Sequence, residues 1–302
     1  MKFMNFSRKH APNLVRLGCV FGETCFDITK AIGDDLLEFP RVVFMIEEVL
    51  QVKDGLLIIE EQLRGLKRAS SGIQSFLFPS SDITFRAPIT RPQKFIGIGL
   101  NYKDHVEEIK GQIPKHPLLF GMYANAIIGP EQSIIIPSMS QQVDFEAELG
   151  VVIGRRARHV PAENATHYVA GYTIINDVSA RDLQFSDGQW LRAKSFDTFA
   201  PIGPYLVTPD TLHDGDGVDI ELRLNGNTMQ KSNTRNMIFK VPELISYISK
   251  VMTLEVGDVI ATGTPAGVGF VRNPQVFMKP GDVVEIEIEG IGQLRNPVAA
   301  FD

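Results

Sequence analysis

The sequence predicts an α+β protein in which a small N-terminal α+β domain precedes a larger domain dominated by β-sheet. The 302 residues are enough for two domains, or for one large domain with an appendage. Residues 43–67 repeat apolar side chains at helical spacing, whereas the chain beyond residue 89 is rich in short runs of branched apolar residues that end at Gly, Pro or Asn. We therefore expect a boundary near residue 88, with domains at 1–88 and 89–302.

The N-terminal domain is expected to begin with a hairpin, because residues 14–28 alternate around Gly22. The helical pattern of 43–67 follows this hairpin. Residues 69–92 are rich in Ser and Pro, a composition more typical of a connection than of a helix or a strand. We therefore expect an irregular connection between the two domains.

The larger domain is expected to be mostly sheet, with strands predicted at 94–99, 133–137, 145–153, 170–178, 218–224 and 283–288. Asn225-Gly226 directly follows one of these strands and favours a hairpin, because both central positions of a type I′ turn need positive φ. Pro242 is expected to open a helix, since proline is tolerated at the first helical position and the apolar residues after it share one face. A shorter helix is expected from Pro161.

Composition and charge are typical of a folded globular protein and disfavour several classes of function. Apolar residues make up 44% and charged residues 22% of the chain. The net charge of -6 has the wrong sign for a surface that binds phosphate backbones or anionic lipids, so we expect no nucleic-acid and no membrane partner. Cys19 and Cys25 form no CxxC pair, and the N-terminus lacks an apolar export signal. These features predict a cytoplasmic protein with reduced thiols.

Acidic residues at alternating positions, Glu146 and Glu148, open an apolar strand. Side chains two residues apart point to the same face of a strand, and the apolar run 149–153 is typical of a strand buried on both faces. Two buried carboxylates need a cation. Asp177 ends another apolar strand, and three carboxylates with open positions favour Mg²⁺ or Mn²⁺ over a metal that needs His or Cys. The alternatives are a solvated strand edge for the glutamates and a turn or N-cap for Asp177.

His105 is the candidate general base. If residues 101–109 are helical, Glu108 lies one turn away at i,i+3, where its carboxylate can orient the imidazole and raise its basicity. The alternative is an ordinary surface histidine. Residues 110–117 are polar and proline-containing, as in a mobile flap or a surface loop. The glycine-rich stretch 263–269 lacks the ending of a phosphate loop, but its backbone amides could bind a carboxylate; the alternative is a tight turn.

Five ordered motifs resemble the fumarylacetoacetate hydrolase family and together span about residues 85 to 300. They are GLNYKDH at 99–105, DFEAEL at 144–149, GYTIINDVSARDLQ at 171–184, KSFDT at 194–198 and GDVIATGTP at 257–265. The small domain before them is similar to that of the longer bacterial members, including oxaloacetate decarboxylase-like ones. The resemblance implies a mixed β-roll catalytic domain, a homodimer, and binding of Mg²⁺ or Mn²⁺ by Glu146, Glu148 and Asp177.

The resemblance also implies roles for other residues. His105 and Glu108 match the family's water-activating dyad, on a segment that closes over the substrate as a lid, and Lys194 matches a catalytic position. The positions that match the family's substrate pocket are Arg181, Gln184, Lys194 and Thr264. Two residues depart from the pattern, because Phe145 stands where many relatives have Tyr and Met122 where many have Lys. The second departure removes a cation expected near the far end of the substrate.

The substrates that the resemblance implies are small 2-oxo acids with a further carbonyl or carboxylate group. The leading hypothesis is a divalent-metal-dependent hydrolase that cleaves a C–C bond in acylpyruvate-type, fumarylpyruvate-like 2,4-dioxo acids through a metal-bound pyruvate enolate. His105 would activate the water, and Lys194 with Arg181 would balance the charge of the incoming carboxylate.

Three alternatives to this hydrolase remain. An oxaloacetate decarboxylase needs only the metal as an electron sink, and a 2-hydroxymuconate-type isomerase or decarboxylase would use related chemistry. A non-catalytic, metal-stabilised small-molecule sensor belongs to a different class. The sensor hypothesis gives no task to His105 or Lys194.

Overall fold

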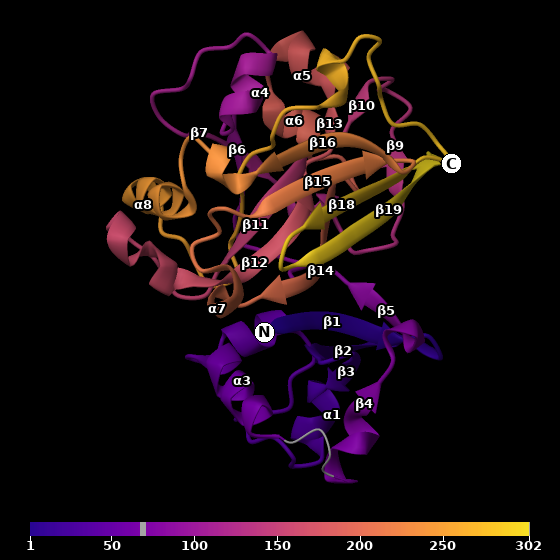
Figure 1. Cartoon of the computed structure of the whole chain (residues 1–302), viewed down its shortest axis with the longest axis vertical. Coiled ribbons are helices and arrows are strands. Elements are labelled where there is room, and N and C mark those ends of the chain that lie inside the picture. Colours follow the sequence, from indigo (N-terminus) through magenta and orange to yellow (C-terminus); the bar gives the residue numbers. More distant parts are fainter. Residues whose placement is uncertain (67–70, 302) are drawn as a thin grey trace.

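The computed structural model describes residues 1–66 and 71–301 and has the α+β fold that the sequence predicts. The N-terminal unit and the larger unit lie at opposite ends of the long axis (Figure 1). No helix within the described ranges is long and apolar enough to cross a membrane. The elements of the N-terminal unit are β1 (Lys2–Arg8), β2 (Ala11–Phe21), β3 (Thr24–Asp27), α1 (Ile28–Gly33), α2 (Ile46–Leu50), α3 (Gly55–Gly65), η1 (Ser71–Phe76), β4 (Leu77–Phe78), η2 (Ser80–Asp82) and β5 (Ile83–Arg86).

The N-terminal unit confirms the predicted hairpin and corrects the predicted connection. Strands β2 and β3 pair around the turn at Gly22. The helical pattern of 43–67 is split into α2 and α3, because the chain turns before Asp54, which has φ 57°. The described part of 69–92 is not wholly irregular, since β4 pairs with β3 and β5 pairs with β1. The end of the predicted helical pattern and the start of the predicted connection fall on residues 67–70, which lie outside the described ranges.

The larger unit alternates short helices with many strands. Its elements are β6 (Phe95–Gly99), α4 (Lys103–Glu108), β7 (Leu118–Met122), η3 (Ala124–Ala126), β8 (Ile127–Ile128), β9 (Ile134–Ile136), β10 (Val143–Asp144), β11 (Ala147–Ile153), η4 (Ala162–Tyr168), β12 (Val169–Asn176), β13 (Ser179–Ala180), α5 (Arg181–Asp187), α6 (Trp190–Lys194), β14 (Ala200–Val207), α7 (Pro209–Leu212), β15 (Asp219–Leu224), β16 (Asn227–Asn233), η5 (Thr234–Asn236), α8 (Val241–Val251), β17 (Val259–Ala261), η6 (Gly269–Val271), β18 (Val283–Ile288) and β19 (Gly292–Ala300).

Each of the six strands predicted in the larger unit overlaps an observed strand. Asn225 and Gly226 have φ values of 52° and 78°, so the predicted hairpin turn between β15 and β16 is confirmed. Helix α8 begins one residue before Pro242, whereas the helix expected after Pro161 is the 3₁₀ segment η4. Strand β14 was not predicted, because the two prolines within it argue against a strand that lies inside a sheet.

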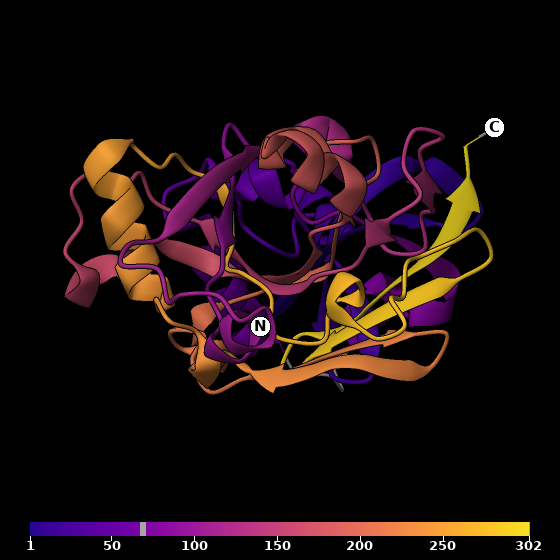
Figure 2. The same cartoon turned by 90° about the horizontal axis from the view of Figure 1, so that it is seen from above.

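Two sheets enclose the core of the larger unit (Figure 2). The first has the order β4-β3-β2-β1-β14-β12-β11-β17-β6-β7, with β5 beside β1 and β8 beside β14, and the second has the order β16-β15-β18-β19-β9. Strands β11, β12 and β14 of the first sheet pack against β15, β18 and β19 of the second. Apolar side chains such as Leu149, Ile174 and Ile286 are buried between them.

The first sheet continues through both units. Strand β1 pairs with β14 through the partners Lys2↔Val207 and Phe3↔Leu206. A backbone ladder therefore crosses the boundary that the sequence places near residue 88. The division into 1–88 and 89–302 stays a prediction.

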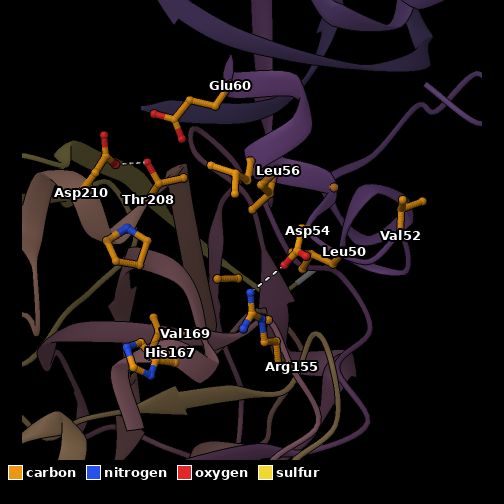
Figure 3. Close-up of a pocket in the computed structure, with 15 residues that line it drawn as sticks. Leu50, Val52, Asp54, Leu56, Glu60, Arg155, His167, Val169, Thr208 and Asp210 are labelled. Carbon is orange, nitrogen blue, oxygen red and sulfur yellow. Dashed lines mark hydrogen bonds and ion pairs between the residues drawn. The ribbon is translucent and has the colours of Figure 1, made fainter. Parts of the chain in front are cut away.

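The junction of the two units also contains a cavity of about 240 Å³. Figure 3 shows Leu56 of α3 on one side of it and Val169 of β12 on the other. Asp54 and Arg155 lie along one wall, where Asp54 Oδ1 accepts from Arg155 Nη2 at 2.6 Å. This cavity contains none of the residues predicted to carry chemistry.

Candidate active site

The three carboxylates that the sequence singles out converge. Glu148 lies in β11, Glu146 precedes that strand, and Asp177 follows β12. The two strands pair antiparallel with Ala147 opposite Asn176, so the start of one meets the end of the other. One oxygen from each carboxylate lies within 4.8 Å of the others, and all three side chains are buried. The expected convergence is therefore present.

Two buried cations face these carboxylates. Lys194, the last residue of α6, donates from Nζ to Glu146 Oε2 at 2.8 Å and to Asp177 Oδ2 at 2.6 Å. Arg181, the first residue of α5, donates from Nη2 to Glu146 Oε1 at 2.7 Å. Glu148 has a backbone partner, because its Oε2 accepts from the amide of Gly263 at 2.8 Å.

The pKa values of the three acids differ because each faces a different balance of burial and charge. Burial raises the pKa of Glu146, but Lys194 and Arg181 outweigh burial and lower that pKa to about 2. Burial, followed by the charges of Asp177 and Glu146, raises the pKa of Glu148 well above its ordinary value. Burial also raises the pKa of Asp177, to about 7, although Lys194 opposes the change. The cluster therefore needs more positive charge than Lys194 and Arg181 supply.

The donor set fits a hard divalent cation. Within the part of the chain that the structure describes, Asp177 Oδ1 is one of the few buried side-chain oxygens with no hydrogen-bond partner. Glu146, Glu148 and Asp177 are the residues that would hold Mg²⁺ or Mn²⁺, since both ions prefer carboxylate oxygens. When bound, such an ion would act as a Lewis acid toward an oxygen of the substrate. The identity of the ion stays a prediction.

Helix α4 carries the expected base and its orienting acid. His105 Nδ1 lies 3.4 Å from Glu108 Oε2, and the His105 side chain is buried. The amide of Gly267 donates to both oxygens of Glu108, at 2.9 and 3.1 Å. Glu108 is thus held between the amide of Gly267 and the imidazole of His105. Since Nδ1 of His105 faces Glu108, Nε2 is the ring nitrogen that can contact a substrate.

His105, Glu146 and Glu148 line one cavity together with the expected substrate residues. Gln184 Oε1 accepts from Arg181 Nη1 at 2.9 Å. Thr264 Oγ1 donates to the carbonyl of Ala147 at 3.0 Å and accepts from Gln230 Nε2 at 2.8 Å. The residues that line the cavity are Ile98, Gly99, Leu100, His105, Ile109, Phe120, Glu146, Glu148, Arg181, Gln184, Phe185, Trp190, Lys194, Thr264 and Phe270. Asp177 is not among these residues. It is in contact with Lys194, which lines the cavity and also donates to Glu146.

Sequence reasoning assigned no role to three residues of the site. Asp144 binds Arg181, and its place in the alternating series of acids at 144, 146 and 148 was the signal that could have found it. Gln230 comes from β16 and gave no local signal. Trp190, the only tryptophan of the chain, lines the cavity and gave no signal from its spacing.

Other expectations about the site turn out differently. The amides of the glycine-rich stretch do bind carboxylates, but these are the chain's own, as at Gly263 and Gly267. Phe145 and Met122 are both buried in the core, and neither is among the residues that line the cavity. The two departures from the family pattern therefore affect the packing behind the cavity rather than its surface.

Comparison with known proteins identifies the family. A family model described as fumarylacetoacetate (FAA) hydrolase C-terminal matches residues 94–299. A protein of Rattus norvegicus named oxaloacetate tautomerase Fahd2a, mitochondrial, is 47% identical over 239 residues, which are 79% of this chain and 76% of the rat protein.

Solved structures agree with this match. Those of a fumarylacetoacetate hydrolase from Exiguobacterium antarcticum and of 5-carboxymethyl-2-hydroxymuconate delta-isomerase from Mycobacterium smegmatis are each 35% identical to this chain, with coverage of 100% of both chains. Their TM-scores are 0.82 and 0.75. The chain belongs to the fumarylacetoacetate hydrolase family and is an enzyme.

Proposed function

We propose that this enzyme binds a small 2-oxo acid with the help of a divalent cation and moves a proton between the 2-oxygen and the neighbouring carbon, as in the tautomerisation of oxaloacetate. One observation carries the proposal: His105, which is in contact with Glu108, lines the same cavity as Glu146 and Glu148, two of the three clustered carboxylates. The names of the rat relative and of the Mycobacterium smegmatis structure, a tautomerase and an isomerase, support a proton transfer.

The chain's own residues account for each part of this reaction. Lys194 donates two of its three N–H groups to Glu146 and Asp177, so the third can donate to an oxygen of the substrate. His105 takes the proton of the enol hydroxyl and returns it to the adjacent carbon, and Glu108 stabilises the imidazolium that forms between the two steps. As the O–H bond breaks and the C–H bond forms, the C=C double bond of the enol becomes a single bond and the C–O bond becomes the C=O bond of the 2-oxo acid; no other bond changes.

Hydrolysis of an acylpyruvate is the second candidate. It is favoured by the match to a fumarylacetoacetate hydrolase over the whole length of both chains. Here His105 would take a proton from water, the hydroxide would add to the distal carbonyl, and the C–C bond would break to release the enolate of pyruvate. The same residues can serve both reactions, because the distal carbonyl that the water attacks is bonded to the carbon that is protonated in the tautomerisation, so one base can reach either position.

The test follows the fate of oxaloacetate and of an acylpyruvate with Mg²⁺, Mn²⁺ or a chelator. A tautomerase would be detected by loss of the enol absorbance, a decarboxylase by release of carbon dioxide, and a hydrolase by loss of the dioxo acid. His105→Ala should abolish tautomerisation and hydrolysis, but should spare a decarboxylation that needs only the metal. Equal activity in metal-stripped enzyme would contradict the proposal, and specific binding with no turnover of any 2-oxo acid would favour the sensor.

We also propose a cytoplasmic homodimer. Phe185 on α5, Leu191 on α6 and Tyr123 after β7 are 62%, 39% and 57% exposed, and α6 contacts both α5 and β7. Large exposed apolar groups on one face favour burial by a partner. The thiols of Cys19 and Cys25 are free and buried, which suits a reducing compartment. Light scattering should give twice 33.5 kDa, and a monomeric mass would contradict the dimer.

A further inference from the structure

Asp144 is fully buried at the end of β10, and each of its contacts is with a charged or backbone donor. Its Oδ1 accepts from the amides of Gly269 at 2.8 Å and Phe145 at 2.9 Å. Its Oδ2 accepts from the amide of Phe270 at 3.1 Å and from Arg181 Nε at 2.9 Å. One carboxylate therefore joins Arg181 to the Gly269–Phe270 rim of the cavity.

The same contacts fix the plane of the Arg181 guanidinium. Nε, Nη1 and Nη2 donate to Asp144, Gln184 and Glu146 respectively. The guanidinium carbon also lies 4.5 Å from the centre of the Phe270 ring. Because Asp144 holds both Arg181 and the amide of Phe270, it sets the distance between the charged wall of the cavity and its aromatic rim.

We propose that Asp144 is a positioning residue, which holds Arg181 and Phe270 in the arrangement that binds the substrate. The inference rests on the proposed function, because it takes the Arg181 guanidinium to face a 2-oxo acid. Arg181 and Phe270 line the cavity, whereas Asp144 is not among the lining residues. Asp144 therefore acts through these two neighbours.

The contacts explain why a carboxylate is needed here. Asp144→Asn keeps the shape of the side chain but replaces one acceptor atom by a donor. Whichever way the amide faces, its NH₂ group opposes two of the four N–H donors, which lose their acceptor. We expect KM for the 2-oxo acid to rise tenfold or more. We expect a smaller change in kcat, because His105 and Glu108 make no contact with Asp144.

Asp258 offers a matched control. It is also fully buried, accepts from the amides of Lys94 and Glu255 at 2.8 and 2.7 Å, and pairs with Lys94 Nζ at 2.8 Å. It does not line the cavity. Asp258→Asn should therefore reduce stability as Asp144→Asn does, while KM for the 2-oxo acid stays within about twofold of the original enzyme.

A second measurement does not depend on turnover. Amide hydrogen exchange across 263–271, measured by mass spectrometry on the free protein, should accelerate in Asp144→Asn and stay unchanged in Asp258→Asn. The double variant Asp144→Asn/Arg181→Gln should raise KM by less than the product of the two single effects, because Asp144 acts partly through Arg181. If Arg181→Gln does not fold, hydrogen exchange across 263–271 alone tests whether Asp144 positions the rim of the cavity.

Unchanged exchange across 263–271, or additive effects on KM, would overturn the positioning role. The failure of the proposed function looks different. In that case the original enzyme turns over no 2-oxo acid, while the exchange and the binding of oxalate still report whether Asp144 holds the rim.

Discussion

The ammonium nitrogen of Lys194 lies 2.6 Å from Asp177 Oδ2, within a cluster that holds more buried acids than buried bases. Asp144, Glu146, Glu148 and Asp177 carry four formal negative charges, whereas Lys194 and Arg181 carry two positive charges. Buried charges are stable only when balanced. A divalent cation would supply the two missing charges, so the metal, Lys194 and Arg181 would balance the cluster together.

Lys194→Met should separate stability from metal binding. The metal-free variant is expected to be destabilised by about 3–5 kcal/mol, because it leaves Glu146 and Asp177 without their shared buried partner. Affinity for Mg²⁺ should be retained or increased, since a competing positive charge is gone, while kcat should fall at least 100-fold. Thermal unfolding with chelator and with Mg²⁺ measures the first two effects.

The control for this variant is Lys231→Met. Lys231 is 74% exposed and forms an ion pair with Glu221 near the surface, so its loss should change the melting temperature very little. Equal destabilisation of the two variants would contradict the balancing role of Lys194.

The stability of the metal-free protein should fall as the pH rises from about 4 to about 7. Burial raises the pKa of Asp177 from 3.8 to about 7, so the folded protein keeps a proton that the unfolded chain has already lost. The unfolded state then binds fewer protons, and stability decreases with pH in this window. The raised pKa of Glu148 acts in the same direction. Urea unfolding in the presence of chelator checks the slope.

Metal binding should show the opposite dependence on pH. An ion must displace the protons held by Asp177 and Glu148, so affinity for Mg²⁺ should weaken at least tenfold per pH unit below 7. Stabilisation by saturating Mg²⁺ should therefore grow between pH 6 and about 7. A metal affinity that is independent of pH in this range would exclude Asp177 as a ligand.

Glu108→Gln should slow the reaction while leaving the fold intact. The glutamine oxygen can still accept from Gly267, but the negative charge beside the His105 imidazole is lost. We expect kcat to fall about 10- to 100-fold with little change in KM. Glu107→Gln, at an exposed position on the same helix, is the control and should behave as the original enzyme. Steady-state kinetics on both variants gives the comparison.

Gly99→Ala should move the only tryptophan of the chain. A Cβ atom at Gly99 would lie 2.3 Å from Trp190 Cζ3 and 2.5 Å from Leu118 Cδ2, so the indole must shift. We expect altered Trp190 emission without substrate and a several-fold higher KM, because Trp190 lines the cavity. Gly65→Ala, where no atom lies within 4 Å of the added carbon, is the control. Identical emission spectra of all three proteins would contradict this packing.

The metal candidates were predictable because their signal is local. The spacing of two between Glu146 and Glu148 predicts that the two side chains point the same way, and a buried strand that begins with acids implies a cation. The same period extends to Asp144, but its partners Arg181 and Gly269 are 37 and 125 residues away, so nothing near it in the sequence shows what it holds.

Long-range pairing limited the prediction of the fold in the same way. Strands β1 and β14 pair across about 200 residues. The prolines of β14 argue against a strand, and only the neighbouring strands reveal it. Gln230 could not be predicted as a site residue for the same reason, because it lies in the second sheet and donates to Thr264, 34 residues along the chain. Patterns along the chain identified the elements with strong periodicity, but they carried no information about which elements meet.

Asn5 ties three segments together at the junction of the two units. Its Nδ2 donates to the carbonyls of Ala87 and Pro88 at 3.0 and 3.1 Å, and its Oδ1 accepts from the amide of Ile46 at 2.9 Å. Asn5→Leu leaves these buried backbone groups without partners and should cost about 2–4 kcal/mol. Asn13→Leu, at an exposed position on β2, should change stability by less than about 0.5 kcal/mol.

The mode of unfolding tests whether the junction behaves as one structure. Trp190 reports on the larger unit, and far-ultraviolet circular dichroism reports on both units. Because the first sheet runs through the junction, the two signals should change together in urea for the original protein and for Asn5→Leu. Two separate transitions in the original protein would show that 1–88 unfolds independently, and the ladder between β1 and β14 would then contribute little to stability.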